Sequence, residues 1–212
     1  MRDIIKEACV ETLDEAILAE KKGANRVELC SRLELGGLTP NRKLIKQVFN
    51  ALDIPIKVMI RPRAGNFSYN YQELNIMKKD ILFCKNLNVQ GVVFGILDQN
   101  KKIDIKNMRY LSETIDNFEI TFHKAIDQTG SIIDEIDKLV TIGCISSILT
   151  SGGALNAHSG KIFLKMLVEK YRETITIIPA GSITKNNIYT LHHIIGAKEY
   201  HGRKIVGDLG PN

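Results

Sequence analysis

The sequence predicts a TIM-type (β/α)8 barrel that forms one domain over residues 1–212. Short apolar runs rich in β-branched residues alternate with longer helical segments from end to end, and no linker or low-complexity segment interrupts them. Eight such runs are present, which is the number of strands that closes a barrel. A chain of 212 residues with 44% apolar residues can bury a substantial core, although it is short for this fold.

The eight predicted strands cover residues 4–9, 26–30, 56–61, 91–95, 119–123, 146–150, 174–179 and 198–201. An open, doubly wound sheet would show the same alternation, but it usually carries a glycine-rich nucleotide fingerprint after the first strand. The sequence at that position is CVETLDEA, which contains no glycine. The barrel is therefore the favoured architecture.

Two of the intervening helices carry clear start and stop signals. Thr12 and Glu15 have the spacing of a capping box, and Gly23 marks the end of that helix. Thr184 is expected to begin a later helix that ends at Gly196.

The region after the eighth strand predicts an incomplete outer ring of helices. Only GRKIVGDLGPN follows that strand, so the eighth helix is expected to be short or missing. A missing helix would leave an apolar flank uncovered, and we expect a second subunit to cover it in a homodimer.

Composition excludes several classes of protein. The net charge of +5 comes from 29 basic and 24 acidic residues that are scattered along the chain, which disfavours nucleic-acid binding. No apolar run approaches the roughly 18 residues of a membrane span, and the acidic residues near the start are unlike a signal peptide. We expect a cytoplasmic protein with no membrane association, whose four well-separated cysteines stay reduced.

Acidic and thiol side chains recur together at the ends of the first two strands. Glu7 and Cys9 lie two residues apart, as do Glu28 and Cys30. Alternate residues of a strand share one face, so each strand can direct its carboxylate and its thiol the same way. In this fold the functional residues lie at the carboxyl ends of the strands.

Other strand ends carry groups suited to anion binding and acid–base chemistry. Arg61 and Arg63 flank a proline, and their guanidinium groups are candidates for binding an anion. His123 titrates near neutral pH, and Asp127 follows four residues later as a carboxylate that could orient it. We therefore predict Glu7, Arg61, His123 and Asp127 as candidate catalytic residues.

Small residues follow the sixth and seventh strands, where backbone N–H groups could approach a ligand. The loops after strands seven and eight often bind phosphate in such barrels. The candidate ligand-binding residues are Glu28, Arg63, Thr150, Ser151, Gly152, Gly181, Ser182 and His201.

A purely structural interpretation of these residues stays open. The side chains of Glu7, Glu28, Arg61 and Arg63 could neutralise one another in a buried ion network, because unpaired charges inside a barrel are costly. His123 could be an interior histidine bonded to a carbonyl group, and the glycine turns could be only tight turns. Cys84 and Cys144 are expected to be small buried hydrophobic residues.

The ordered motifs EACVETLDEA, GANRVELCSRLELGGLTP, VMIRPRAGNF, GVVFGILD, TFHKAID, ILTSGG and YHG resemble the CutC proteins, a family named for a proposed role in copper homeostasis. The resemblance covers essentially the whole chain. It implies a TIM barrel, a cytoplasmic location, a homo-oligomer, and Cu(I) binding by the cysteines at positions 9 and 30. Typical members continue past the histidine–glycine turn into a further helix, and this chain departs from them there.

Two functions are compatible with these observations. The first is Cu(I) binding in copper homeostasis, with Cys9 and Cys30 as ligands and His123 or Met59 as possible helpers, because soft thiolates hold Cu(I) in low coordination. The second is an enzyme that acts on a small anionic or phosphorylated metabolite, which would use more of the polar residues at the strand ends. No organic cofactor is predicted.

Overall fold

The computed structural model describes residues 4–113, 115 and 118–210. In these residues eight strands form one parallel sheet whose neighbours run in the order β7-β6-β5-β4-β3-β2-β1-β8. The strands are β1 (Ile5–Val10), β2 (Arg26–Leu29), β3 (Ile56–Met59), β4 (Gly91–Phe94), β5 (Glu119–Phe122), β6 (Ser147–Thr150), β7 (Thr176–Pro179) and β8 (Glu199–Gly202). Each strand lies within two residues of its predicted bounds at both ends, and the TIM-type barrel is confirmed.

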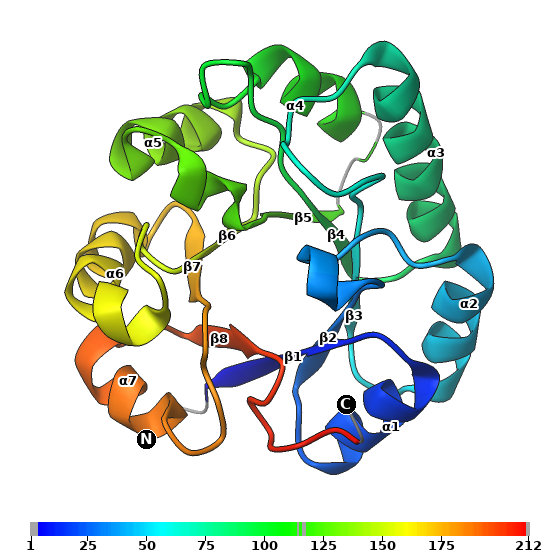
Figure 1. Ribbon diagram of the computed structural model, residues 1–212, viewed down its shortest axis with the longest axis vertical. Coiled ribbons are helices and arrows are strands. Elements are labelled where there is room, and N and C mark those ends of the chain that lie inside the picture. Colours follow the sequence, from blue (N-terminus) through cyan, green and yellow to red (C-terminus); the bar gives the residue numbers. More distant parts are fainter. Residues whose placement is uncertain (1–3, 114, 116–117, 211–212) are drawn as a thin grey trace.

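Helices surround the ring of strands, as Figure 1 shows in a view down the barrel. They are α1 (Leu13–Lys21), α2 (Arg42–Ala51), α3 (Tyr71–Leu87), α4 (Ile105–Ser112), α5 (Ile132–Ile142), α6 (Ala157–Tyr171) and α7 (Ile188–Ile195), with 3-10 turns η1 (Leu33–Leu35) and η2 (Lys124–Gln128). The main hydrophobic core fills the space between the sheet and these helices.

The helix signals were partly confirmed. The Thr12 side chain accepts a hydrogen bond from the Glu15 N–H at 3.1 Å, but the Glu15 carboxylate bonds to the N–H of Glu11, so only half of the capping box forms. The predicted helix start at Thr184 was wrong. Helix α7 begins at Ile188, because Asn187 accepts the Thr184 N–H and a turn occupies the residues between them. Gly196 ends α7 in a left-handed conformation, as expected.

No helix follows β8 within residues 203–210, as the sequence predicted. This segment runs from β8 toward α1, at the red end of the colour scale in Figure 1. Its apolar residues Ile205, Val206 and Leu209 are buried and join the main core. Residues 203–210 therefore cover part of the barrel surface on which an eighth helix would lie. The predicted homodimer remains a prediction.

The inside of the barrel is unusually polar. Arg26 is buried between Glu7 and Glu199, at 2.5 Å from a carboxylate oxygen of each. Between β3 and β5, the Lys57 ammonium group lies 2.9 Å from the Thr121 hydroxyl and 3.1 Å from a carboxylate oxygen of Glu119. Buried charges are tolerated where they are paired, and these groups are. A buried ion network is therefore present, but its members differ from those that the sequence suggested, because Glu7 pairs with Arg26 and Arg63 pairs with Glu73.

In the described residues, no helix is both long and apolar enough to cross a lipid bilayer.

Candidate metal site

Five polar side chains from three neighbouring strands meet inside the barrel. We call them the thiol–carboxylate cluster; its members are Glu7, Cys9, Glu28, Cys30 and His201. The strand register explains why they meet, because Cys9 pairs with Glu28 across β1 and β2, and Glu7 pairs with His201 across β1 and β8. The expectation that both strands direct their thiol and carboxylate to one face is confirmed.

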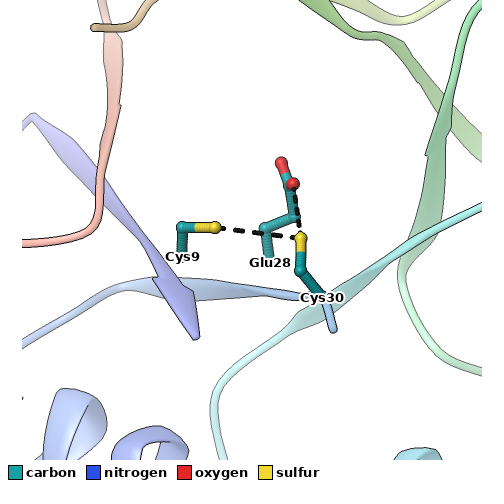
Figure 2. A group of neighbouring side chains, drawn as sticks. All are labelled: Cys9, Glu28 and Cys30. Atoms are coloured by element: carbon teal, nitrogen blue, oxygen red, sulfur yellow. Dashed lines mark hydrogen bonds between the residues drawn. The ribbon is translucent and has the colours of Figure 1, made fainter. Parts of the chain in front are cut away.

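The thiols and one carboxylate lie in direct contact. The Cys9 Sγ atom is 3.8 Å from the Cys30 Sγ atom, and the Cys30 Sγ atom is 3.1 Å from Oε1 of Glu28. Figure 2 shows the three side chains pointing toward one another. Their ligand atoms all lie within 4.8 Å of one another, as do those of Glu7, Glu28 and His201.

His201 connects the two carboxylates of the cluster. Its Nδ1 atom is 2.8 Å from Oε1 of Glu7 and 3.6 Å from Oε2 of Glu28. Arg26 holds the other oxygen of Glu7, so the Glu7 side chain is fixed between a guanidinium group and an imidazole. This chain of contacts fixes the orientation of the His201 ring.

The two thiols have unequal acidity because of where they lie. The hydrogen-bonded Cys30 thiol lowers the pKa of Cys9 to about 6, with a further contribution from His201 and against the opposing effect of burial. The contact with Cys9, together with burial and the nearby Glu28, raises the pKa of Cys30 well above its usual value. Cys9 is therefore the thiol of the pair that ionises first, and thiolates are both nucleophiles and metal ligands.

The acidic groups of the cluster also differ. Burial raises the pKa of Glu28 to about 7. Burial would raise the pKa of Glu7 as well, but the hydrogen bond from His201 and the charge of Arg26 hold it well below its usual value. Although burial opposes its charge, Glu28 and bonds to Cys9 and Glu7 raise the pKa of His201. The neighbouring carboxylates thus favour the protonated form of the ring beside the two thiols.

Apolar and soft side chains line the thiol pair. Cys9, Cys30, Met59 and Val93 form a buried group of their own inside the barrel, and Leu33 packs against it. The Met59 methyl group and the Cys30 sulfur both lie near Gly37, where an added Cβ would be 3.6 Å and 3.4 Å from them. Cys84 is buried on α3, and Cys144 follows α5, so these two lie outside the cluster.

Arg61 and Arg63 bond to the loops around them. The Arg61 guanidinium donates to the carbonyl oxygens of Leu35, Gly37 and Gly65 and stacks on the Phe67 ring at 4.8 Å. Arg63 bonds to Glu73 and to carbonyl groups of residues 64, 66 and 68. Most of the N–H donors of Arg61 and Arg63 that an anion would need are therefore already hydrogen-bonded within the protein.

His123 and Asp127 are not paired with each other in the described residues. The His123 Nδ1 atom accepts the Ala125 N–H at 3.3 Å, and its Nε2 atom is buried without a hydrogen-bond partner in the described part of the chain. Burial, and then the charge of Arg61, lowers the pKa of His123 to about 3. The ring packs against Phe67 at 4.7 Å between ring centroids. His123 is therefore a neutral interior histidine at neutral pH.

Asp127 fills the turn after β6. Its carboxylate accepts hydrogen bonds from the Thr150 hydroxyl, from both the N–H and the hydroxyl of Ser151, and from the Gly153 N–H. The Gly152 N–H donates to Thr150. The backbone donors that were expected to bind a ligand anion here bind a carboxylate of the protein itself.

The turn after β7 packs beside the turn after β6. The Gly181 carbonyl accepts the Ala157 N–H, and a Cβ on Gly181 would lie 3.2 Å from the Asn156 Cα. Gly181 has φ of +98° and Ser182 has φ of +56°, so both have left-handed backbone. Close packing accounts for the glycine at position 181.

Sequence reasoning missed the buried ions beneath the cluster, which are Arg26, Lys57 and Glu199. The first two lie on predicted strands at the alternating positions that face the same side as Glu28. That alternation was the signal that could have identified them.

Comparisons with known proteins agree with the fold and the motifs. A sequence model of the CutC family matches residues 4–206. A CutC family protein of Histophilus somni (strain 2336) is 37% identical over 195 residues, covering 92% of this chain and 80% of that protein. The copper homeostasis protein cutC homolog of Homo sapiens is 36% identical over 197 residues, covering 93% of this chain and 72% of that protein.

Solved structures give the same result. The crystal structure of CutC from Streptococcus agalactiae superimposes with a TM-score of 0.90 and 35% identity, over 96% of this chain and all of that one. A dihydrodipicolinate synthetase from Pseudomonas aeruginosa, at 12% identity and a TM-score of 0.64 over 96% of this chain and 71% of that one, shares the fold alone. From the family match and these relatives we conclude that the chain belongs to the CutC family.

Proposed function

We propose that this protein binds Cu(I) through the thiolates of Cys9 and Cys30 and acts in cytoplasmic copper homeostasis as a homodimer. The observation that carries the proposal is the buried pair of thiols, with their sulfur atoms 3.8 Å apart. Thiolates are soft ligands that select Cu(I). The names of the relatives, which refer to copper homeostasis, agree with this choice.

The surroundings of the pair support the same function. Met59 adds a soft thioether to the apolar group around the sulfurs, and the nearby His201 favours ionisation of Cys9. A reduced cytoplasmic environment keeps both thiols available for the metal. Cu(I) entering the pair would replace the thiol protons and would gain a site that excludes water.

The alternative, an enzyme acting on a small anionic metabolite, has less support from the geometry. It needs free donors at Arg61 and Arg63 and at the turn that contains Ser151. These donors bond to loop carbonyls, to Glu73 and to Asp127. We therefore retain copper binding as the proposed function.

A competition titration tests the proposal. Fully reduced protein is titrated anaerobically with Cu(I) against a chromogenic Cu(I) chelator, and we expect one tight equivalent. The Cys9→Ser/Cys30→Ser variant should lose that equivalent, and Cys84→Ser/Cys144→Ser, the matched control, should keep it. Equal Cu(I) affinity in the wild type and in the Cys9→Ser/Cys30→Ser variant would overturn the proposal.

A further inference from the structure

The metal donors in the barrel extend beyond two thiols. Glu28 contacts Cys30 directly, and the ligand atoms of Cys9, Glu28 and Cys30 lie within 4.8 Å of one another. Three converging donors of mixed type, with an imidazole beside them, exceed what two-coordinate Cu(I) requires. We infer that Cys9, Cys30, Glu28 and His201 form a four-donor site for a tetrahedral divalent cation of the Zn²⁺ class. This inference rests on the proposed role of the two thiols as metal ligands.

The sulfur separation fits tetrahedral coordination. A metal about 2.3 Å from each sulfur places the two sulfurs about 3.8 Å apart in tetrahedral geometry and about 4.6 Å apart in linear geometry. The observed separation is 3.8 Å. The two sulfur atoms therefore already have the spacing that a tetrahedral ion needs.

Glu28 supplies an independent reason to expect a cation. Its side chain is 1% exposed, and its Oε2 atom is buried with no hydrogen-bond partner among the residues that the structure describes. A buried carboxylate oxygen without a partner is costly, because it loses its hydration and gains nothing in exchange. A metal ion beside Cys30 would give Glu28 a direct ligand bond in place of the missing hydrogen bond, in addition to the His201 ring at 3.6 Å.

His201 is placed to be the fourth donor. Its Nδ1 atom lies 3.6 Å from Oε2 of Glu28, and the ligand atoms of His201, Glu28 and Glu7 lie within 4.8 Å of one another, so Glu28 belongs to both groups of donors. Metal-binding histidines typically bond to a carboxylate through the ring nitrogen that does not bind the metal. Glu7 occupies that role at Nδ1, and Arg26 fixes Glu7 in turn. The inference therefore assigns the metal to Nε2 of His201.

Cobalt(II) is the probe for the test, because it replaces zinc and reports its own geometry by absorption. The wild type should bind one equivalent of Co²⁺, with intense tetrahedral d–d bands and thiolate charge transfer that Zn²⁺ abolishes. Glu28→Gln should weaken Co²⁺ and Zn²⁺ binding by about 10-fold to 100-fold, because it removes the charged oxygen donor of the site.

The matched control is Glu119→Gln, which removes a carboxylate that pairs with Lys57, outside the cluster, and should keep wild-type Co²⁺ affinity. X-ray absorption of the zinc-loaded wild type, which requires no variant, should give two sulfur and two nitrogen or oxygen ligands. Equal Co²⁺ affinities in Glu28→Gln and Glu119→Gln, or an octahedral spectrum in the wild type, would overturn the four-donor site.

The wild-type titrations separate this inference from the proposed function. Tight Cu(I) binding with weak, octahedral Co²⁺ binding would support copper binding and overturn the four-donor site. Tight tetrahedral Co²⁺ binding without tight Cu(I) binding would support the four-donor site and overturn copper binding. Failure to bind either metal would overturn both.

Discussion

Cys9 and Cys30 are 21 positions apart in the chain, yet their sulfur atoms lie 3.8 Å apart inside the barrel. This contact follows from the parallel pairing of β1 with β2, which places the ends of the two strands side by side. Two thiols at this distance can bind one soft ion, and thiols in contact are also candidates for oxidation to a disulfide bond. Metal binding and oxidation should therefore compete for the same pair.

We predict that hydrogen peroxide oxidises Cys9 and Cys30 to a disulfide. Peroxide converts the thiolate to a sulfenic acid, the second thiol displaces its oxygen as water, and the peroxide is thereby reduced. The rate should rise as pH increases through about 6, because the Cys9 pKa lies there. Mass spectrometry of a non-reducing digest should find the linked peptides, and Cu(I) binding should be lost until a reductant is added.

Cys84 is the internal control for this reaction. Burial raises its pKa to about 12, so it should stay reduced at the same peroxide concentration. Oxidation of Cys84 before the pair, in a protein that remains folded, would contradict the prediction.

Arg61→Ala should destabilise the protein without changing Cu(I) affinity. The substitution leaves three loop carbonyl groups without their charged donor, and we expect a loss of about 3 kcal/mol in the free energy of unfolding. Urea unfolding measures the loss. Arg203→Ala is the control, because Arg203 is half exposed and lies 3.6 Å or more from its acidic partners, so it should cost less than about 1 kcal/mol. Weakened Cu(I) binding by a folded Arg61→Ala protein would instead give the arginine a role in the metal site.

Asp127→Gly should convert the turn after β6 into an anion site. The variant frees the N–H groups of Ser151 and Gly153 and should lose about 1–3 kcal/mol of stability. Inorganic phosphate should then raise the melting temperature of the variant more than that of the wild type, with sodium chloride at equal ionic strength as the control. Equal stabilisation of both proteins would show that phosphate binds elsewhere, and it would strengthen the alternative enzymatic function.

The fold was largely predictable because alternation and strand count are properties of the sequence pattern. Asn187 shows where such prediction failed: both asparagine and threonine can begin a helix, and only the fold decides which of them does. The shared face of Glu7 with Cys9, and of Glu28 with Cys30, was predictable from their alternate positions in each strand. The contacts between the two thiols and between Glu7 and His201 were not, because they depend on the register of the paired strands.

The roles of Arg61 and Asp127 were not predictable from the sequence. Each side chain binds backbone groups of loops distant in sequence, and those loops present their carbonyl or N–H groups only after folding. A strand-end arginine that binds an anion and one that binds loop carbonyls have the same sequence context. The structure therefore favours the thiol pair over an anion site as the candidate functional site.

His123 should make the protein less stable in acid, and His123→Asn should reduce that effect. Burial lowers the folded-state pKa to about 3, whereas an unfolded histidine titrates near 6.5. The unfolded state therefore binds an additional proton between these values, and the stability contributed by the neutral ring is complete above about pH 6.5 and is lost progressively as pH falls toward 3.

Asparagine can still accept the Ala125 N–H but carries no titrating group in this range. Urea unfolding at pH 7 and pH 5 should show a smaller decrease for the variant, by about 1–2 kcal/mol. Equal decreases in the two proteins would contradict this prediction. They would mean that the His123 ring is protonated in the folded state and that its Nε2 atom has a hydrogen-bond partner.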